Sequence, residues 1–557
     1  MPIYPALGGN SWISSKIDVA SRLFHESPFG GRICLGLFVL LFALGAPVLN
    51  AQTYLDLHNF DGLGGGCCPQ YPFVLAQGRD GNVYGVTASG GTNGIGVVFK
   101  ITPAGTYSIL HNFDTVHGST PIGGLTLGLD GNLWGTTEEG GAHGFGNIFR
   151  ITPAGAFTVV YNFTGNADGG HPVSPLVIGS DGNFHGTSYP GYSYKISTAG
   201  VFTAPGKIPG TTYGPLLQAK DGSWYGVTEF DGTASAGTIY KITGATFTIL
   251  HSFDGTKGSY PIGGLVQAAD GNFYGTTTAG GTANAGVVYR MTPSGTYTVV
   301  VNFQSKNPAL NGYQSYAGLI KGSDGNLYGV TIWGGLYGYG VIFRLTTAGV
   351  YTKLYDFSAP LGDGAYSTPM QHTNGEIFGM TSRGGGTVGH GVIYSFKDSL
   401  SPFVQVVNRG GVVGSTVQIL GSGLSTASSV TFNGTPASFH VVSNTFLTAL
   451  VPSGETGFLT VTTSGGTMVS NSIFRVIPTM SGFTPASGAV GSSVVITGTG
   501  LIQTAHITVG GAGVATYTVN SDSQLTFKVP TGATTGKVVV TTPGGQAASS
   551  TAFTVTP

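Results

Sequence analysis

A six-residue element recurs seven times in this 557-residue chain, at intervals of 40 to 54 residues. Each copy starts with Asp-Gly or Asn-Gly and ends in a glycine five positions later; the copies begin at Asp80, Asp130, Asp181, Asp221, Asp270, Asp324 and Asn374. Asp-Gly supplies the positive φ angles of a tight hairpin turn, and the residues that follow are typical of a strand. A period of about 40–50 residues with several strands per unit indicates a β-propeller.

The second repeat unit shows how one blade is built. Strands are predicted at residues 124–129, 133–137, 147–151 and 156–163, with turns at 130–132 and 152–155. Pro153 and Gly155 suit turn positions. Four antiparallel strands per unit make one blade, so the sequence predicts an all-β chain.

The two ends of the repeat array complement each other. The seventh unit lacks a fourth strand after Phe396, and a lone copy of that strand, residues 54–60, precedes the first unit. Pairing of the two would close the ring and remove a free sheet edge. We therefore predict a seven-bladed β-propeller over residues 52–397, with the strand at 54–60 as the outer strand of the seventh blade.

The repeat resembles a known family. The elements Asp-Gly-Asn-Leu-Tyr-Gly at 324–329, Gly-Val-Ile-Phe-Arg at 340–344, Arg-Ile-Thr-Pro at 150–153 and Leu-His-Asn-Phe at 110–113 look like the GloVer (Gloeo/Verruco) tandem repeat of exported bacterial "choice-of-anchor" proteins. This resemblance covers residues 54–396 and implies no established activity. More loosely, the units resemble blades of streptogramin lyase and other NHL-type propellers.

After residue 397 the period stops, and two further units follow at 403–477 and 478–557. Both carry alternating short strands and matching turns, among them Val451-Pro-Ser-Gly and Val529-Pro-Thr-Gly. Such strands with such turns indicate β-sandwiches. The units resemble IPT/TIG domains, which are immunoglobulin-like modules. That resemblance implies a spacer or a module that binds proteins or glycans.

Composition and the N-terminal segment point to export. Only 8% of the residues are charged, and the formal net charge is −1, so no basic stripe favours nucleic acid as a partner. Arg32 precedes a 12-residue apolar run at 33–44, with a cleavage site expected after Ala51. We predict a signal peptide at 1–51, no membrane span in the mature chain, and a secreted or cell-surface location; an uncleaved anchor is the alternative.

The repeated polar residues are predicted to be structural. One Asp per hairpin serves a turn, whereas a calcium site needs several converging oxygen ligands. His58, His111 and His251 share a repeat position that other units fill with Tyr or Val, which indicates packing. Cys67 and Cys68 are adjacent, and neighbouring cysteines rarely bridge without strain, so we expect two unbridged loop residues. No metal or cofactor is predicted.

Candidate binding residues lie where the repeats disagree. Loops on a rigid scaffold commonly carry function. The two positions after each second strand differ from unit to unit, and aromatic side chains there suit contact with sugar rings. The eight candidates are Glu138, Glu139, Glu229, Phe230, Trp333, Tyr337, Tyr339 and Arg383. The alternative is that they are solvated loop residues and packing aromatics.

Taken together, these features favour an exported, non-catalytic binding or adhesion protein that presents a loop face to glycans or surface proteins. No catalytic residue is predicted, because no catalytic triad order, nucleophile elbow, metal-ligand cluster or phosphate loop is found. The only candidate residues for acid–base chemistry are Glu138, Glu139, Glu229, His117, His143 and His390. The alternatives are a propeller-type lyase or glycan-cleaving enzyme and a structural cell-surface component.

Overall fold

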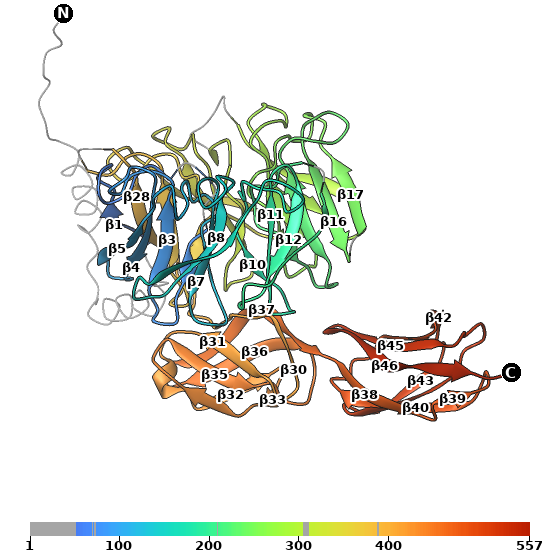
Figure 1. Cartoon of the computed structure of the whole chain (residues 1–557). Coiled ribbons are helices and arrows are strands. Elements are labelled where there is room, and N and C mark those ends of the chain that lie inside the picture. Colours follow the sequence, from blue (N-terminus) through green and yellow to red (C-terminus); the bar gives the residue numbers. More distant parts are fainter. Residues whose placement is uncertain are drawn as a thin grey trace, which may run out of the picture. The chain divides into compact units, whose positions relative to one another are not determined.

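A computed structural model describes residues 52–69, 71, 74–208, 210–244, 246–304, 311–386 and 389–557. The predicted signal peptide at 1–51 lies outside the described residues. The described regular structure comprises 46 strands and a single-turn 3-10 helix, η1 (Leu424–Thr426) (Figure 1). The chain is all-β, as its repeats predict.

Seven four-stranded antiparallel sheets occupy residues 53–397. Six of them take four strands in chain order, and the seventh takes β26, β27, β28 and then β1. The strands are β2 (Ala76–Gln77), β3 (Val83–Thr87), β4 (Val97–Ile101) and β5 (Tyr107–Asn112); β6 (Leu125–Leu127), β7 (Leu133–Thr137), β8 (Asn147–Ile151) and β9 (Phe157–Asn162); β10 (Val177–Ile178), β11 (Phe184–Ser188), β12 (Tyr192–Ile196) and β13 (Phe202–Lys207); β14 (Leu217–Gln218), β15 (Trp224–Thr228), β16 (Thr238–Thr243) and β17 (Thr246–Ser252); β18 (Val266–Gln267), β19 (Phe273–Thr276), β20 (Val287–Met291) and β21 (Tyr297–Asn302); β22 (Ile320–Lys321), β23 (Leu327–Val330), β24 (Val341–Leu345) and β25 (Tyr351–Asp356); β26 (Met370–Gln371), β27 (Ile377–Thr381), β28 (Val392–Lys397) and β1 (Thr53–Asn59).

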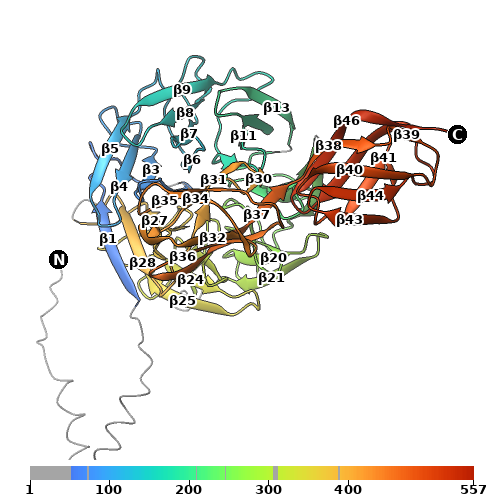
Figure 2. The ribbon, with the colours of Figure 1, turned by 90° about the horizontal axis from the view of Figure 1, so that it is seen from below.

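The N-terminal strand completes the seventh sheet, as the sequence predicts. β1 pairs antiparallel with β28 from Thr53 opposite Lys397 to Asn59 opposite Val392. The Tyr54 ring stacks on Tyr355 of the preceding sheet, with ring centroids 4.3 Å apart. Seen from below, the sheets follow one another around a circuit from β1 back to β28 (Figure 2).

The Asp-Gly turns are held by the aspartate itself. In the fifth unit, Asp270 Oδ1 accepts the backbone N–H of Asn272 at 3.1 Å, and Oδ2 accepts the Asn272 amide and the Tyr274 hydroxyl, both at 2.8 Å. Gly271 has a φ of 84°, which L side chains rarely adopt. The carboxylate therefore organises the hairpin, which is the structural role expected for it.

The repeated histidines pack between neighbouring sheets, as predicted. Their rings stack on aromatic rings at centroid distances of 3.7 Å for His58 on Tyr107, 3.9 Å for His111 on Phe157 and 4.0 Å for His251 on Tyr297. Burial lowers the pKa of each of these histidines. They are neutral stacking partners near neutral pH.

Residues 404–557 form two pairs of sheets with one shared topology. The first pair has the orders β29-β31-β35-β34 and β30-β37-β36-β32-β33, and the second has β38-β40-β44-β43 and β39-β46-β45-β41-β42. Each pair encloses its own apolar core. The strands are β29 (Gln405–Val406), β30 (Gly410–Val412), β31 (Thr416–Leu420), β32 (Ser429–Phe432), β33 (Thr435–Pro436), β34 (Phe439–Val441), β35 (Phe446–Leu450), β36 (Gly457–Thr463), β37 (Gly466–Ile477), β38 (Thr479–Thr484), β39 (Ser487–Gly488), β40 (Ser493–Thr499), β41 (His506–Val509), β42 (Ala512–Gly513), β43 (Tyr517–Ser521), β44 (Gln524–Lys528), β45 (Gly536–Thr542) and β46 (Gly545–Val555).

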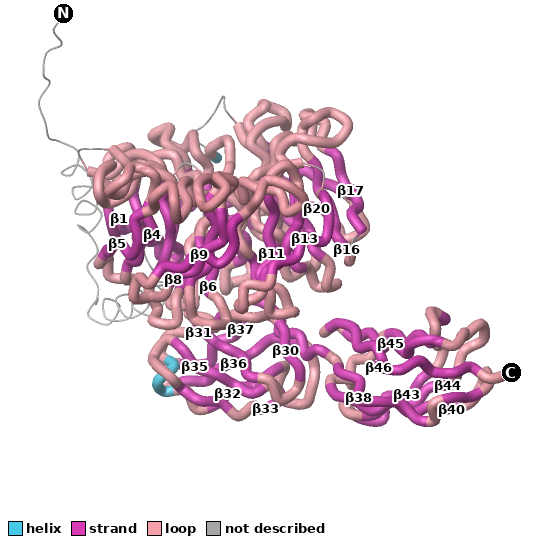
Figure 3. The backbone as a smooth tube through the Cα atoms, viewed as in Figure 1, coloured by secondary structure: helices cyan, strands magenta, loops and turns pink. Residues whose placement is uncertain are grey.

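The first sheet pair contacts the Asp-Gly turns of the seven sheets. Arg79, beside the first turn, donates to Gln418 Oε1 at 2.7 Å, and its carbonyl accepts the Thr445 hydroxyl at 2.7 Å. Gln418 also donates to the carbonyl of Leu129, beside the second turn, at 2.7 Å. The long loops gather at the opposite end of the seven sheets (Figure 3). That end carries the loop positions singled out from the sequence.

Candidate functional site

Short backbone ladders hold the long loops in place. In most repeat units the residues after the second strand pair with the segment that enters the unit, as Ser119 does with Glu139 and Asp363 with Arg383. The N–H of Glu138 donates to the Thr120 carbonyl at 3.0 Å, and the N–H of Glu229 donates to the Thr211 carbonyl at 3.1 Å. Divergent side chains therefore project from equivalent, hydrogen-bonded backbone positions.

Two of the predicted glutamates act on one tyrosine. Burial raises the pKa of Tyr213, and the charges of Glu229 and then Glu138 raise it further. Burial also raises the pKa of Glu229, and burial followed by the charge of Glu139 raises that of Glu138. Carboxylates of the second and fourth units, which are 91 residues apart in sequence, thus act on the same tyrosine.

Three more tyrosines extend this group. After burial, Glu138 and Glu139 raise the pKa of Tyr71, and Glu229 raises that of Tyr316. The rings of Tyr316 and Tyr366 lie 5.2 Å apart, centroid to centroid. Arg383 opposes the raised pKa of Tyr366. We call Tyr71, Glu138, Glu139, Tyr213, Glu229, Tyr316, Tyr366 and Arg383 the acidic–tyrosine cluster; five of the seven repeat units contribute to it.

Sequence reasoning missed the four tyrosines of this cluster. Tyr213, Tyr316 and Tyr366 share one repeat position, eight residues before the Asp or Asn that starts the hairpin turn, where other units carry Ile122, Val173 and Ile262. An aliphatic residue at this position in three of the seven units suggests core packing. The signal that could have identified them is that a phenol replaces an aliphatic side chain at this one position in three units.

Arg383 also ties Trp333 to the cluster. The guanidinium carbon lies 4.6 Å from the centroid of the Trp333 ring, a cation–π distance. Arg383 Nε lies 3.3 Å from Asp363 Oδ2, so the cation is paired. The partly buried Trp333 ring therefore contacts a cation of the cluster that is paired with Asp363.

The remaining predicted aromatics lie apart from one another. Tyr337 is exposed, whereas Tyr339 is partly buried against the core of the sixth and seventh sheets. Phe230 is exposed, and its ring centroid lies 5.4 Å from that of Tyr260. Among the described residues, no ring contact joins Trp333 to Tyr337 or Tyr339.

The histidines considered for acid–base chemistry are dispersed. His117 is exposed and pairs with Asp114, its Nδ1 2.9 Å from Oδ2, and His143 is exposed. His171, which was not predicted, places Nδ1 3.1 Å from the Glu138 carbonyl, and its charge lowers the pKa of Glu138 against the effect of burial. Of these histidines, His171 is therefore the one whose ring contacts the backbone of a cluster residue.

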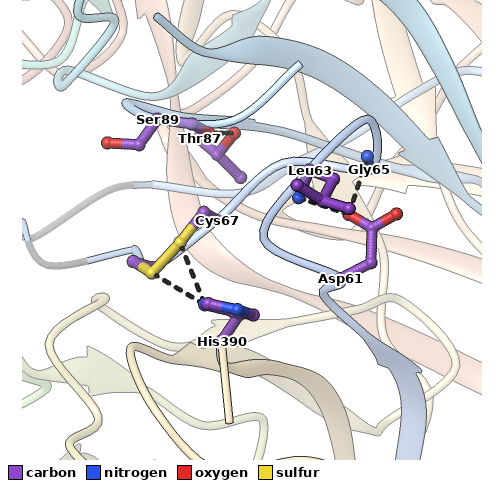
Figure 4. Close-up of a disulfide and its surroundings, with 8 residues drawn as sticks. Asp61, Leu63, Gly65, Cys67, Thr87, Ser89 and His390 are labelled. Atoms are coloured by element: carbon purple, nitrogen blue, oxygen red, sulfur yellow. Dashed lines mark hydrogen bonds between the residues drawn. A yellow bond between two sulfur atoms is a disulfide. The ribbon is translucent and has the colours of Figure 1, made fainter. Parts of the chain in front are cut away.

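The prediction of two unbridged cysteines was wrong. Cys67 and Cys68 form a disulfide between neighbouring residues. Both sulfurs face His390, whose Nδ1 lies 3.6 Å from Cys67 Sγ and 3.7 Å from Cys68 Sγ (Figure 4). The sequence could not show this arrangement, because His390 lies more than 320 residues away and reaches the cysteines only through closure of the seventh sheet.

The fold and this site define an all-β repeat protein with loop-borne polar and aromatic residues. The Gloeobacter/Verrucomicrobia repeat matches residues 46–200 and 211–445, more than half of the sequence, so the chain belongs to that family. The IPT/TIG domain matches residues 478–556, which contain the second sheet pair. No curated protein matches the chain.

Similarity to solved structures is weak. The surface glycan-binding protein PbSGBP-B from Prevotella bryantii is 19% identical over 28% of this chain and 39% of its own, with a TM-score of 0.21. SGBP-B from Bacteroides uniformis is 22% identical over 27% and 48%, with a TM-score of 0.15. The extracellular domain of a hybrid two-component system from B. thetaiotaomicron is 13% identical over 86% and 63%, with a TM-score of 0.41. The chain thus spans less than half of the two glycan-binding proteins, and these values assign it no function.

Proposed function

We propose that the chain is an exported binding protein in which the seven sheets are the blades of a β-propeller over residues 52–397. Four antiparallel strands per repeat and the pairing of β1 with β28 support this architecture. We further propose immunoglobulin-like IPT/TIG domains at 403–477 and 478–557. The identical strand orders of the two sheet pairs support an IPT/TIG assignment for the first as well as the second.

The proposed ligand is a glycan, or the glycan-like surface of a cell-surface protein, bound by the acidic–tyrosine cluster. The observation that carries the proposal is that the charges of Glu138 and Glu229 both act on Tyr213 and that the charge of Glu229 also acts on Tyr316, so side chains of the second, fourth and sixth units influence one another. Tyrosine rings offer apolar faces for sugar rings, and carboxylates accept hydrogen bonds from sugar hydroxyls. The phenols are neutral near neutral pH, as tyrosines with an ordinary or raised pKa are, so they can both donate and accept hydrogen bonds.

Binding without catalysis is proposed because the surroundings of the cluster suit fixed recognition of a ligand. Arg383 is paired with Asp363 and packs on Trp333, which suits a fixed recognition element. Loops at one end and the docked first sheet pair at the other would allow the protein to present the cluster away from its attachment. The apolar run at 33–44 supports a secreted or cell-surface location. Among the described residues, no helix is long and apolar enough to span a bilayer.

A glycan array probed with residues 52–557 tests this function. We expect a defined set of oligosaccharides to bind, and Tyr316→Ala to weaken binding by about 1–3 kcal/mol, as for a large aromatic contact at a binding hot spot. Tyr337→Ala is the matched control, because that exposed tyrosine lies outside the cluster. An array with no bound glycan, or equal losses in the two variants, would contradict the proposal.

A glycan-cleaving enzyme is the second candidate. Burial raises the pKa of both Glu138 and Glu229, which is the direction of shift that a general acid requires. Mass spectrometry of each bound oligosaccharide after incubation distinguishes the two functions. New fragments that disappear with Glu138→Gln or Glu229→Gln would establish the enzyme, whereas intact oligosaccharides with both variants still binding support recognition alone. A purely structural surface component would neither bind nor cleave the oligosaccharides.

A further inference from the structure

The Cys67–Cys68 disulfide and His390 lie where the two ends of the repeat array meet. Cys67 and Cys68 follow β1, and His390 precedes β28, which pairs with β1. The N–H of Cys68 donates to the His390 carbonyl at 2.9 Å, and the N–H of Cys67 donates to the Ser89 carbonyl at 3.0 Å. The backbone therefore holds both cysteines and the histidine in one place independently of the S–S bond.

The histidine ring is also held by close packing. Gly62 has a φ of 74°, and a Cβ at this position would collide with the His390 ring. The ring consequently rests against bare backbone, with Nδ1 directed at both sulfurs (Figure 4). One sulfur or nitrogen atom from each of the three residues lies within 4.8 Å of the other two.

The spacing matches one particular coordination geometry. A tetrahedral zinc site has Zn–S bonds of about 2.3 Å and Zn–N bonds of about 2.0–2.1 Å, so each sulfur lies about 3.6 Å from the ligating nitrogen. The two Sγ–Nδ1 distances are 3.6 and 3.7 Å. Only the two sulfurs are closer than such a site requires, because they are bonded to each other.

We propose that reduction of the Cys67–Cys68 disulfide creates a Zn²⁺ site with both thiolates and His390 Nδ1 as ligands. Water fills the fourth position, since three protein ligands leave a tetrahedral zinc open. Oxidised, the same residues form a covalent bridge and cannot hold the ion. The site uses no residue of the acidic–tyrosine cluster and does not depend on the function proposed for that cluster.

The chemistry has two steps. A phosphine reductant supplies two electrons and breaks the S–S bond; water supplies two protons for the thiols and the oxygen that ends on phosphorus. Zn²⁺ then displaces both thiol protons, so binding is accompanied by release of two protons and strengthens as pH rises. A dithiol would serve equally as reductant, becoming a disulfide as it transfers its two hydrogens.

Metal binding by the full-length chain tests the site. Cys34→Ser provides the background, because Cys34 is the remaining cysteine of the sequence. After phosphine treatment and removal of the reductant, thiol titration should find two thiols per chain, and competition with a chromophoric chelator should find one Zn²⁺ per chain. The untreated, oxidised chain should bind at least tenfold less zinc, and Co²⁺ added to the reduced chain should give a thiolate-to-cobalt absorption band.

Two variants locate the ligands. His390→Ala should weaken zinc binding by the reduced chain at least tenfold and leave two titratable thiols, whereas His143→Ala, which removes an exposed histidine, should change neither. The oxidised chain is a further control, because its sequence is unchanged while both sulfurs are held in the disulfide and cannot bind zinc. Equal zinc binding by oxidised and reduced chains, no binding by the reduced chain, or full binding by His390→Ala would each overturn the proposal.

Discussion

At several repeat positions in this protein, the units share the same side-chain contact but not the same residue type. His111 stacks on Phe157 with centroids 3.9 Å apart, and in the next unit Tyr161 stacks on Phe202 at the same distance. The turn shows the same behaviour. In the fifth unit the Asp270 carboxylate accepts the Tyr274 hydroxyl, whereas the seventh unit has Phe378 in place of the tyrosine and Asn374 in place of the aspartate. Variation among units therefore identifies the physical requirement at each position.

The stacked histidines should make the stability of the protein depend on pH. Burial lowers the pKa of His58, His111 and His251 in the folded chain, whereas an unfolded histidine titrates at about 6.5. As the pH falls below about 6.5, the unfolded chain binds more protons than the folded chain does. Stability that is present above this pH is therefore lost as the pH falls toward and through the lower pKa values of the folded chain. The triple His→Tyr variant keeps the stacks, as Tyr161 does, and removes the titration.

Between pH 7.5 and pH 5 the melting temperature of both proteins should fall. We expect the fall to be a few degrees smaller in the triple variant than in the wild type. Thermal unfolding followed by circular dichroism at both pH values measures this difference. His440→Tyr is the control, because His440 is exposed in the first sheet pair. An identical fall in the triple variant and the wild type would show that these histidines do not govern the acid sensitivity.

How much of the candidate site could be predicted depended on the residue type. Glu138, Glu229 and Arg383 were found because charged residues in a chain with only 8% charge stand out from the repeat. Tyr213 and Tyr316 were missed because a tyrosine at an otherwise aliphatic position can belong either to the core or to a surface. Burial and neighbouring charge separate these two cases, and both are set by tertiary structure.

At the scale of elements, internal repetition made most of the fold predictable. The fourth strand of the second unit, predicted at 156–163, is β9 at Phe157–Asn162, and the lone copy at 54–60 is β1. Repetition says nothing about contacts unique to one unit. His390 against Cys67 arises only where the first and last units meet, so seven aligned copies contain no trace of it.

Removal of β1 tests how closure stabilises the seven sheets. Deletion of residues 53–60 leaves β28 with an unpaired edge and removes Tyr54 from its stack on Tyr355 as well as the fully buried Phe60. We expect a large loss of melting temperature and concentration-dependent aggregation, because free edges pair with other chains. Leu55→Ala is the mild control, since that side chain is exposed on β1. A deletion variant that stays monomeric with an unchanged melting temperature would refute closure.

At the scale of the whole molecule, a few buried or partly buried contacts join the first sheet pair to the seven sheets. The Arg79 guanidinium donates to Gln418 and lies 4.9 Å from the centroid of the Phe446 ring. Arg475, itself buried, donates to the carbonyl of Ala219. Both contacts use residues that adjoin Asp-Gly turns, so the turns serve as a docking surface while the opposite end keeps its loops available.

Arg79 should therefore couple the unfolding of the two regions. Arg79→Ala removes the bonds to Gln418 and to the Leu129 carbonyl and the cover over Phe446. We expect the free energy of unfolding to fall by about 1.5–3 kcal/mol, as for a hydrogen bond to a charged group. In calorimetry, the first sheet pair should then unfold several degrees below its wild-type transition. Lys220→Ala is the matched control, because Lys220 holds the same repeat position in the fourth unit but its side chain reaches the Ala269 carbonyl of the next turn. If both variants unfold alike, the docking of the first sheet pair rests on Arg475 and the remaining contacts, and Arg79 is only a covered surface residue.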